Sequence, residues 1–242
     1  MTAFMGQVAV VTGASSGIGK AIALGIASQG ATLCLVGRQL ATLEAVAQEA
    51  RCTTCRVLCY RADLMCDDDL QALVGSLQQD VDHLDILVHS AGSITLGQVE
   101  EAPVTDFDGQ YRTNVRAPYM LTQALLPMLR PRQGQIVFIN SSVGLNARAG
   151  VGQYAATKHA LKAIADSLRE EVNAAGVRVL SVFLGRTATP MQVAIYTVEG
   201  KEYHPERLLQ PQDVAAVVLN ALSLPRTAEV TDISIRPLMK PL

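Results

Sequence analysis

Short apolar runs alternate with longer amphipathic stretches along most of the chain. The runs are rich in β-branched residues and apolar throughout, which is typical of strands buried on both faces of a parallel sheet. The stretches between them repeat apolar residues at helical spacing. This alternation predicts a single α/β domain, a doubly wound sheet flanked by helices. The seven predicted strands occupy residues 7–11, 31–36, 56–61, 85–89, 135–139, 178–184 and 232–236.

Composition limits the partners of this domain. The 242 residues are 49% apolar and carry a net charge of −2 without a basic cluster, which argues against nucleic acid and anionic lipid. The uncharged run 21–37 has 17 residues, interrupted by Ser28, Gln29 and Gly30, whereas a membrane helix needs about 20 apolar ones. The N-terminus shows no secretory signal. We expect a cytoplasmic protein that binds small molecules or copies of itself.

Four of the five cysteines lie close together, at Cys52, Cys55, Cys59 and Cys66. Their spacing invites a zinc interpretation, but Cys59 falls within a predicted strand, whereas structural zinc ligands usually come in pairs from loops. The odd number of cysteines argues against a disulfide framework. We therefore predict free thiols and no metal site.

A glycine-rich turn follows the first predicted strand and precedes a helical pattern. The stretch reads Thr12-Gly13-Ala-Ser-Ser-Gly17-Ile-Gly19. Glycines at such a corner allow backbone N–H groups to approach a pyrophosphate, and the helix N-terminus adds partial positive charge. In this setting we predict a dinucleotide site, with a purely structural turn as the alternative.

The end of the second predicted strand indicates which dinucleotide binds. A fold that binds NAD usually places a carboxylate here, to accept hydrogen bonds from the ribose 2′-hydroxyl. This chain has Arg38 instead, and its next acid is Glu44 inside a helix. Because a guanidinium pairs well with a 2′-phosphate, the pattern favours NADP(H) over NAD(H). The alternative, a solvated loop arginine, leaves the missing acid unexplained.

Tyr154 and Lys158 lie one turn apart on the same side of a predicted helix. A nearby ammonium can lower a phenol pKa toward the range useful for acid/base catalysis, although the same pair could simply hold a surface together. Ser141 follows the fifth strand, where a hydroxyl could cap a turn or hold a substrate oxygen.

Taken together, the TGxxxGxG turn, the strand-end serine and the YxxxK helix resemble the short-chain dehydrogenase/reductase family over residues 8–237. The resemblance implies a Rossmann-like fold and an NADP(H)-dependent oxidoreductase that interconverts a carbonyl and an alcohol. It implies Tyr154 as general acid/base, Lys158 as its pKa tuner and ribose ligand, and Ser141 as the group that orients the substrate carbonyl beside Tyr154. It also implies Asn114, in the segment Thr-Asn-Val, as the holder of a water in a proton relay.

The resemblance also implies a set of cofactor contacts. Asp63 resembles an adenine contact, but it could equally be the N-cap of the next helix. Two departures stand out: Ser90 replaces a family asparagine, and Leu184 replaces a proline before Gly185. His89 is expected to be a packed or a solvated residue rather than a catalytic one. The implied contacts, besides Tyr154 and Lys158, are Gly13, Ser15, Ser16, Gly17, Ile18, Gly19, Arg38, Asp63, Leu64, Ser90, Ala91, Gly92, Gly185, Thr187 and Thr189.

Residues 190–210 are expected to form a substrate lid over the carboxyl edge of the sheet, with Tyr196, Tyr203 and His204 either lining or packing it. Family members commonly form homodimers or homotetramers through the helices predicted near 103–129 and 152–175. The competing interpretation is a catalytically inactive NADP-binding regulatory protein of the same fold, for which a broken catalytic set would be expected. The substrate and the direction of the reaction stay open.

Overall fold

Seven parallel strands and eight α-helices make up the computed structural model, which describes residues 3–51 and 56–239. All seven predicted strands are present, and the predicted single α/β domain is confirmed. The strands are β1 (Val8–Thr12), β2 (Thr32–Gly37), β3 (Val57–Arg61), β4 (Ile86–His89), β5 (Gln135–Ser141), β6 (Arg178–Leu184) and β7 (Asp232–Ile235). The helices are α1 (Gly17–Ala27), α2 (Leu40–Arg51), α3 (Asp67–Asp80), α4 (Val104–Tyr111), α5 (Ala117–Leu129), α6 (Gly152–Val172), α7 (Pro190–Val198) and α8 (Pro211–Leu222).

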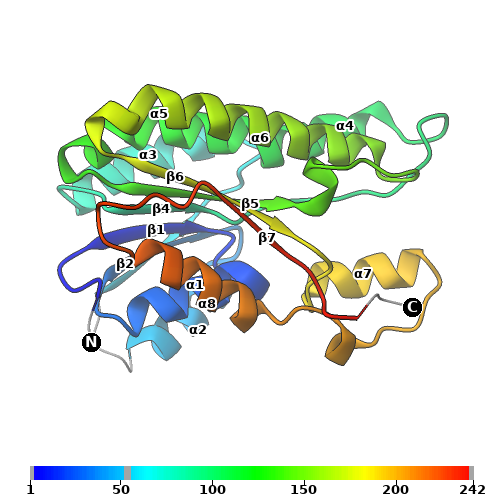
Figure 1. Cartoon of the computed structure of the whole chain (residues 1–242), viewed down its shortest axis with the longest axis horizontal. Coiled ribbons are helices and arrows are strands. Elements are labelled where there is room, and N and C mark those ends of the chain that lie inside the picture. Colours follow the sequence, from blue (N-terminus) through cyan, green and yellow to red (C-terminus); the bar gives the residue numbers. More distant parts are fainter. Residues whose placement is uncertain (1–2, 52–55, 240–242) are drawn as a thin grey trace.

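Helices cover both faces of the sheet, as Figure 1 shows, with α3, α4, α5 and α6 on one face and α1, α2 and α8 on the other. Strand β1 illustrates why its sequence is apolar throughout. Val8 and Val10 belong to the core under α3, α5 and α6, whereas Ala9 and Val11 belong to the core under α1, α2 and α8. Because successive side chains point to opposite faces, a strand with a core on each side needs an apolar residue at every position.

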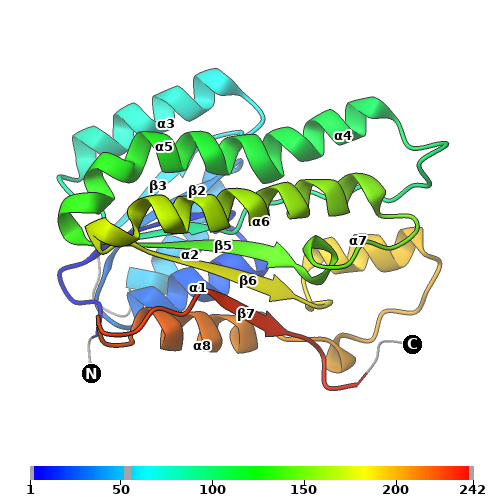
Figure 2. The ribbon, with the colours of Figure 1, turned by 45° about the horizontal axis from the view of Figure 1, so that its top comes forward.

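The strand order β3-β2-β1-β4-β5-β6-β7 reverses direction between β1 and β4. In such sheets, ligands bind at the carboxyl ends of the strands beside this reversal, because the connecting segments diverge there. Figure 2 shows the arrowheads of β5, β6 and β7 pointing toward the end of the molecule where α7 lies. The site is therefore expected at this edge.

The long helix predicted near residues 103–129 is not regular. Five residues, Arg112–Arg116, form a π-helical turn between α4 and α5. A π turn adds one residue per turn and disrupts the regular hydrogen bonding of the helix, and such turns are frequent at functional sites. This one contains Asn114, a residue implied in catalysis.

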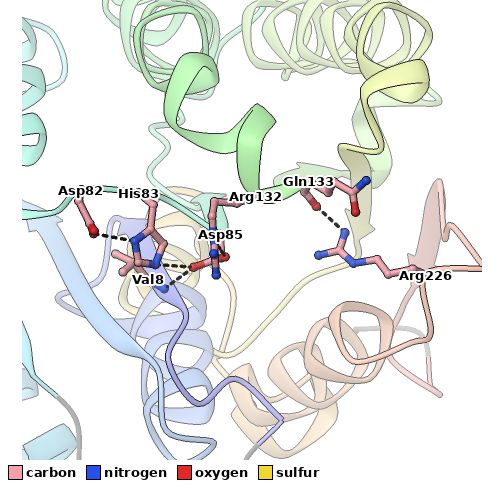
Figure 3. Close-up of polar contacts among 7 residues, drawn as sticks. All are labelled: Val8, Asp82, His83, Asp85, Arg132, Gln133 and Arg226. Carbon is pink, nitrogen blue, oxygen red and sulfur yellow. Dashed lines mark hydrogen bonds and ion pairs between the residues drawn. The ribbon is translucent and has the colours of Figure 1, made fainter.

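At the opposite edge of the sheet, a buried carboxylate joins three segments (Figure 3). Asp85 accepts hydrogen bonds from the Val8 backbone N–H at 2.8 Å and from Arg132 Nε at 2.9 Å, and His83 Nε2 lies 3.3 Å from its Oδ2. Asp82 in turn contacts His83 Nδ1 at 2.6 Å. The cluster ties the starts of β1 and β4 to the turn before β5, far from the carboxyl edge.

The remaining expectations concern cysteines and membranes. Cys34, Cys59 and Cys66 are free, while Cys52 and Cys55 lie outside the described residues. Within residues 3–51 and 56–239, no three His, Cys, Asp or Glu side chains gather as a metal site would require. In the same part of the chain, no helix combines the length and apolar character needed to cross a bilayer.

We expect Asp85→Ala to lower the free energy of unfolding by about 2 kcal/mol, because the buried Val8 N–H loses its acceptor and Arg132 its partner. The matched control is Asp82→Ala, whose carboxylate is exposed and should contribute no measurable stability. Urea denaturation of both variants measures the difference. Equal midpoints for the two variants would contradict this account of the cluster.

Candidate active site

The glycine turn after β1 packs directly against the end of β4. Gly13 has a φ of +67°, and a Cβ there would lie 2.8 Å from the Cα of Ala91. A Cβ on Gly19 would lie 2.4 Å from the Gly13 carbonyl oxygen. Neither position has room for a side chain, so glycine at both allows the turn, the start of α1 and the β4 end to converge.

Thr12 braces the same junction, a role that the sequence analysis missed although the residue belongs to the quoted motif. Its Oγ1 accepts hydrogen bonds from the N–H groups of Ser90 and Ala91 at 3.1 and 3.2 Å and donates to the Val88 carbonyl at 3.3 Å. The hydroxyl thus links β1 to the residues after β4. Ser90 Oγ also lies 3.2 Å from the Cβ position of Gly19, where a longer side chain would be crowded.

A cavity of about 270 Å³ opens at this edge, beside the reversal in strand order. Thirteen of the implied cofactor contacts line it, whereas Gly185, Thr187, Tyr154 and Lys158 do not. Gly37, Ala62, Met65, Ser93, Thr113, Pro190 and Met191 also line it and were missed by the sequence analysis. The implied contacts in its wall are Gly13, Ser15, Ser16, Gly17, Ile18, Gly19, Arg38, Asp63, Leu64, Ser90, Ala91, Gly92 and Thr189.

The wall near the ends of β2 and β3 carries one cation and one acid. Arg38 lies on the rim and is exposed, so its guanidinium can reach a phosphate group there. Asp63 is not the N-cap of α3, so that alternative was wrong: the cap is Cys66, and Asp63 Oδ1 accepts from the Met65 N–H at 3.0 Å. The local turn after β3 uses this acid before the helix begins.

Asn114 is fully buried in the π turn and spans two segments. Its Oδ1 accepts from the Ser93 N–H at 2.8 Å, and its Nδ2 donates to the Ser93 carbonyl at 2.8 Å and to Thr157 Oγ1 at 3.1 Å. The side chain therefore joins the loop after β4 to α6. A Cβ on Gly92 would lie 3.3 Å from Asn114 Oδ1 and 3.9 Å from Lys158 Nζ, which places Gly92 between the cavity and these two residues.

Ser141 ends β5 and both caps a turn and contacts the tyrosine. Its Oγ accepts from the Val143 N–H at 3.4 Å and is also hydrogen-bonded to Tyr154. The neighbouring Asn140 donates from Nδ2 to the Lys158 carbonyl at 3.1 Å, and its Oδ1 accepts from the Ser141 N–H at 2.7 Å. Asn140 therefore fixes the strand end against α6.

Burial dominates the titration of the Tyr154 and Lys158 pair. It raises the pKa of Tyr154 to about 12, against the opposing effect of the hydrogen bond with Ser141. It lowers the pKa of Lys158 to about 8. Lys158 Nζ donates to the Ile139 carbonyl at 2.9 Å and lies 5.7 Å from the centroid of the tyrosine ring. The expected lowering of the phenol pKa is thus not produced by this arrangement: at neutral pH, Tyr154 is a phenol and Lys158 mostly an ammonium.

The segment after β6 reaches back to the glycine turn. Thr189 caps α7 by accepting from the Gln192 N–H at 3.4 Å, and its Cγ2 lies 3.0 Å from the Cβ position of Gly17. Thr187 is buried and donates to the Gly185 carbonyl at 3.2 Å. Leu184 remains within β6, so the change from proline leaves the strand paired with β7 to its last residue.

The predicted lid contains α7 and a small core of its own. Tyr196 is buried and packs edge-on against Tyr203 at 5.4 Å between ring centroids. Arg186 lies over the Tyr196 ring and pairs with Glu199 at 2.5 Å. Of the two alternatives for Tyr196, packing is therefore confirmed. Of the packed and solvated alternatives for His89, packing is confirmed: His89 is buried, stacks on Phe138 and bonds Thr122 Oγ1 at 2.8 Å.

Comparison with known proteins gives one consistent result. The family model described as short chain dehydrogenase matches residues 7–199. An uncharacterized oxidoreductase of Staphylococcus epidermidis is 34% identical, covering 96% of this chain and 97% of its own. An alcohol dehydrogenase from the archaeon Thermococcus sibiricus, solved with 5-hydroxy-NADP, superposes with a TM-score of 0.88 at 26% identity over 98% of this chain and 99% of its own. A metagenomic short-chain oxidoreductase solved with NADP has a TM-score of 0.85 at 30% identity, covering 98% of this chain and all of its own.

The glycine turn makes a direct prediction. Gly13→Ala is expected to weaken NADPH binding by about tenfold or more, because a Cβ 2.8 Å from Ala91 forces the turn and the β4 end apart and the positive φ adds strain of about 1–2 kcal/mol. Gly75→Ala is the control: its Cβ meets no atom within 4 Å on α3, so it should bind NADPH normally and gain about 1 kcal/mol of stability. Fluorescence titration with NADPH measures both dissociation constants, and equal values would contradict the prediction.

Proposed function

The chain belongs to the short-chain dehydrogenase/reductase family, and from this premise we propose that it is an NADP(H)-dependent oxidoreductase that reduces a ketone or aldehyde to an alcohol, or catalyses the reverse. The observation that carries the proposal is the hydrogen bond between Ser141 and Tyr154. Lys158 and Asn114 lie beside Gly92, which lines the cavity at the strand ends. Two hydroxyls that meet at one point suit a carbonyl oxygen, which accepts two hydrogen bonds.

The residues present fit the dinucleotide. The close-packed Gly13 and Gly19 leave room for backbone N–H groups to face a pyrophosphate. Gly92 lines the cavity and lies beside Lys158, so the cavity reaches the proposed catalytic residues. The bound cofactor supplies the hydride. NADP(H) rather than NAD(H) is supported by Arg38 on the cavity rim, by the absence of an acid at that position, and by the NADP in the metagenomic relative.

The chain's own part in reduction is proton transfer. Ser141 donates a hydrogen bond that holds the substrate carbonyl, and Tyr154 gives its phenolic proton to the same oxygen as the carbon is reduced. Since burial keeps Tyr154 protonated at neutral pH, the site is set as a proton donor. The Lys158 ammonium stabilises the phenolate left behind, a contribution that is lost as the pH rises through its pKa of about 8.

The competing function, a regulatory protein that binds NADP without turnover, is disfavoured by the intact catalytic set. Asn114, Ser141, Tyr154 and Lys158 are all present, and all four take part in hydrogen bonds with named partners. The lid over residues 190–210 and a cytoplasmic location remain part of the proposal, with a small carbonyl compound or alcohol as the partner.

Self-association also belongs to the proposal. Apolar side chains lie exposed at helical spacing on α4 and α5: Val104 is 72% exposed, Phe107 37%, Tyr111 48% and Tyr119 51%. Large apolar groups grouped in this way favour burial against a second copy of the chain. A homodimer or homotetramer built on these helices would remove them from water.

Tyr154→Phe is expected to lower kcat for carbonyl reduction by about a hundredfold or more while NADPH still binds, because the phenyl ring keeps the packing and loses the proton. The measurement is NADPH absorbance with a panel of ketones, aldehydes and sugars, together with a binding titration. Retained turnover in this variant would overturn the assignment of Tyr154. No turnover by the unaltered protein across the panel, with NADPH bound, would favour the regulatory alternative.

Arg38→Asp is expected to change the ratio of kcat/KM for NADPH to that for NADH by about tenfold or more in favour of NADH, because the carboxylate repels a 2′-phosphate and accepts from a 2′-hydroxyl. Arg56→Asp makes the same change of charge just before the start of β3, at the end of the strands away from the cavity. It should leave the ratio of the two kcat/KM values unaltered. If both variants show the same ratio of kcat/KM for NADPH to kcat/KM for NADH, Arg38 does not select the cofactor.

In solution we expect a dimer or tetramer at micromolar concentration by light scattering coupled to size exclusion. Tyr111→Glu should shift the population toward monomer, since it places a charge within the exposed apolar face of α4. Met5→Glu alters a still more exposed residue, 68% accessible, near the N-terminus and should not change the mass. A monomer in the unaltered protein would end this part of the proposal.

A further inference from the structure

Thr157 lies between Tyr154 and Lys158 on α6, at a position that the YxxxK motif leaves unspecified, and is 1% exposed. From its contacts we infer that Thr157 is a positioning residue, which sets the orientation of the Asn114 amide and joins it to the backbone of Tyr154. The inference rests on the proposed function, because positioning matters only if Tyr154 and Lys158 carry out proton transfer.

Four hydrogen bonds form a continuous chain across the site. Thr157 Oγ1 donates to the Tyr154 carbonyl at 2.8 Å, and the same oxygen accepts from Asn114 Nδ2 at 3.1 Å. Asn114 then exchanges two bonds of 2.8 Å with the backbone of Ser93. The chain crosses from α6 through the π turn to the loop after β4, so it connects three segments that each carry part of the site.

The chain has only one possible direction. The Thr157 hydroxyl has a single proton, and that proton is given to the Tyr154 carbonyl, so the oxygen can only accept from Asn114. The Ser93 N–H likewise requires an acceptor, and the Ser93 carbonyl requires a donor. If the Asn114 amide were turned by 180°, its Nδ2 would face the Ser93 N–H, and its Oδ1 would face the Ser93 carbonyl and Thr157 Oγ1. These buried groups would then lose their hydrogen bonds.

This orientation decides what Asn114 presents to the rest of the site. Both Nδ2 hydrogens are used, on Ser93 and Thr157, whereas Oδ1 holds one bond and keeps a second lone pair. Oδ1 lies on the side of Gly92, whose Cβ position is 3.3 Å from Oδ1 and 3.9 Å from Lys158 Nζ. Asn114 therefore offers an acceptor, and no donor, toward the region of the lysine ammonium.

Helix stability alone does not account for the threonine. A hydroxyl that bonds back to a carbonyl within its own helix slightly destabilises and bends that helix. The Thr157 hydroxyl must then be favourable because of the hydrogen bond that it accepts from the amide of Asn114. Both side chains are buried, so water does not replace either group if the other is removed.

The test compares Thr157→Val, which keeps the shape and loses the hydroxyl, with Thr157→Ser, which keeps the hydroxyl. We expect Thr157→Val to lower kcat by about tenfold or more with little change in the Kd for NADPH, and to raise the solvent deuterium isotope effect because proton transfer becomes slower. Thr157→Ser should recover most of kcat. Thr122→Val controls for burial, since Thr122 is 5% exposed and bonds His89 Nε2; it should cost stability without altering the isotope effect.

Equal kcat and isotope effect in Thr157→Val and Thr157→Ser would overturn the inference, as would a parallel loss of NADPH binding in Thr157→Val. If the unaltered protein turns over no carbonyl compound, the proposed function fails, and the orientation of Asn114 is decided by hydrogen exchange. Faster exchange at the Ser93 N–H in Thr157→Val than in Thr157→Ser supports the hydrogen-bond chain, and equal exchange rejects it.

Discussion

The close contact between the glycine turn and the end of β4 is the constraint on which the site depends. Gly13 and Gly19 bring the β1 corner, the start of α1 and the Ser90-Ala91-Gly92 segment within van der Waals distance, where no Cβ fits. That contact places Gly92 beside Asn114 and Lys158, and it leaves the cavity open at the reversal of strand order. Thr12 stabilises the same junction with its hydroxyl, so a single corner positions both the wall of the cavity and the proposed catalytic residues.

The four proposed catalytic residues come from elements that are distant from one another in the chain. Ser141 ends β5, Asn114 lies in a π turn, and Tyr154 and Lys158 lie on α6. Short polar contacts from Asn140 to the Lys158 carbonyl and from Asn114 to Thr157 hold these elements in register. Burial then decides the charges, since it favours the neutral phenol and partly disfavours the ammonium. The ionisation of Tyr154 is thus governed by desolvation more than by the neighbouring lysine.

The buried Asp85 cluster and the candidate active site lie at opposite ends of the strands. Asp85 and its partners connect strand starts at one edge, and the cavity and the hydroxyls lie at the other. This division is expected of parallel α/β folds, where hydrogen bonds between segments can close the strand starts while the strand ends remain open to ligands. Changes in the Asp85 cluster should therefore act on unfolding rather than on the cofactor.

Local patterns in the sequence determined the strands, the glycine turn, the strand-end arginine and serine, and the spacing of Tyr154 and Lys158, because each depends on nearest neighbours or on helical and strand periodicity. Only the tertiary structure decided that residues 112–116 wind into a π turn, that Asp63 closes a local turn instead of capping α3, and that Thr12, Asn140 and Thr157 brace the site. The contacts of Thr12, Asn140 and Thr157 are hydrogen bonds between residues far apart in the chain, whereas Asp63 bonds the nearby Met65 N–H, a local alternative to capping the helix. The direction of the Tyr154 pKa shift belongs with them, since desolvation is a property of the packed molecule and not of the YxxxK spacing.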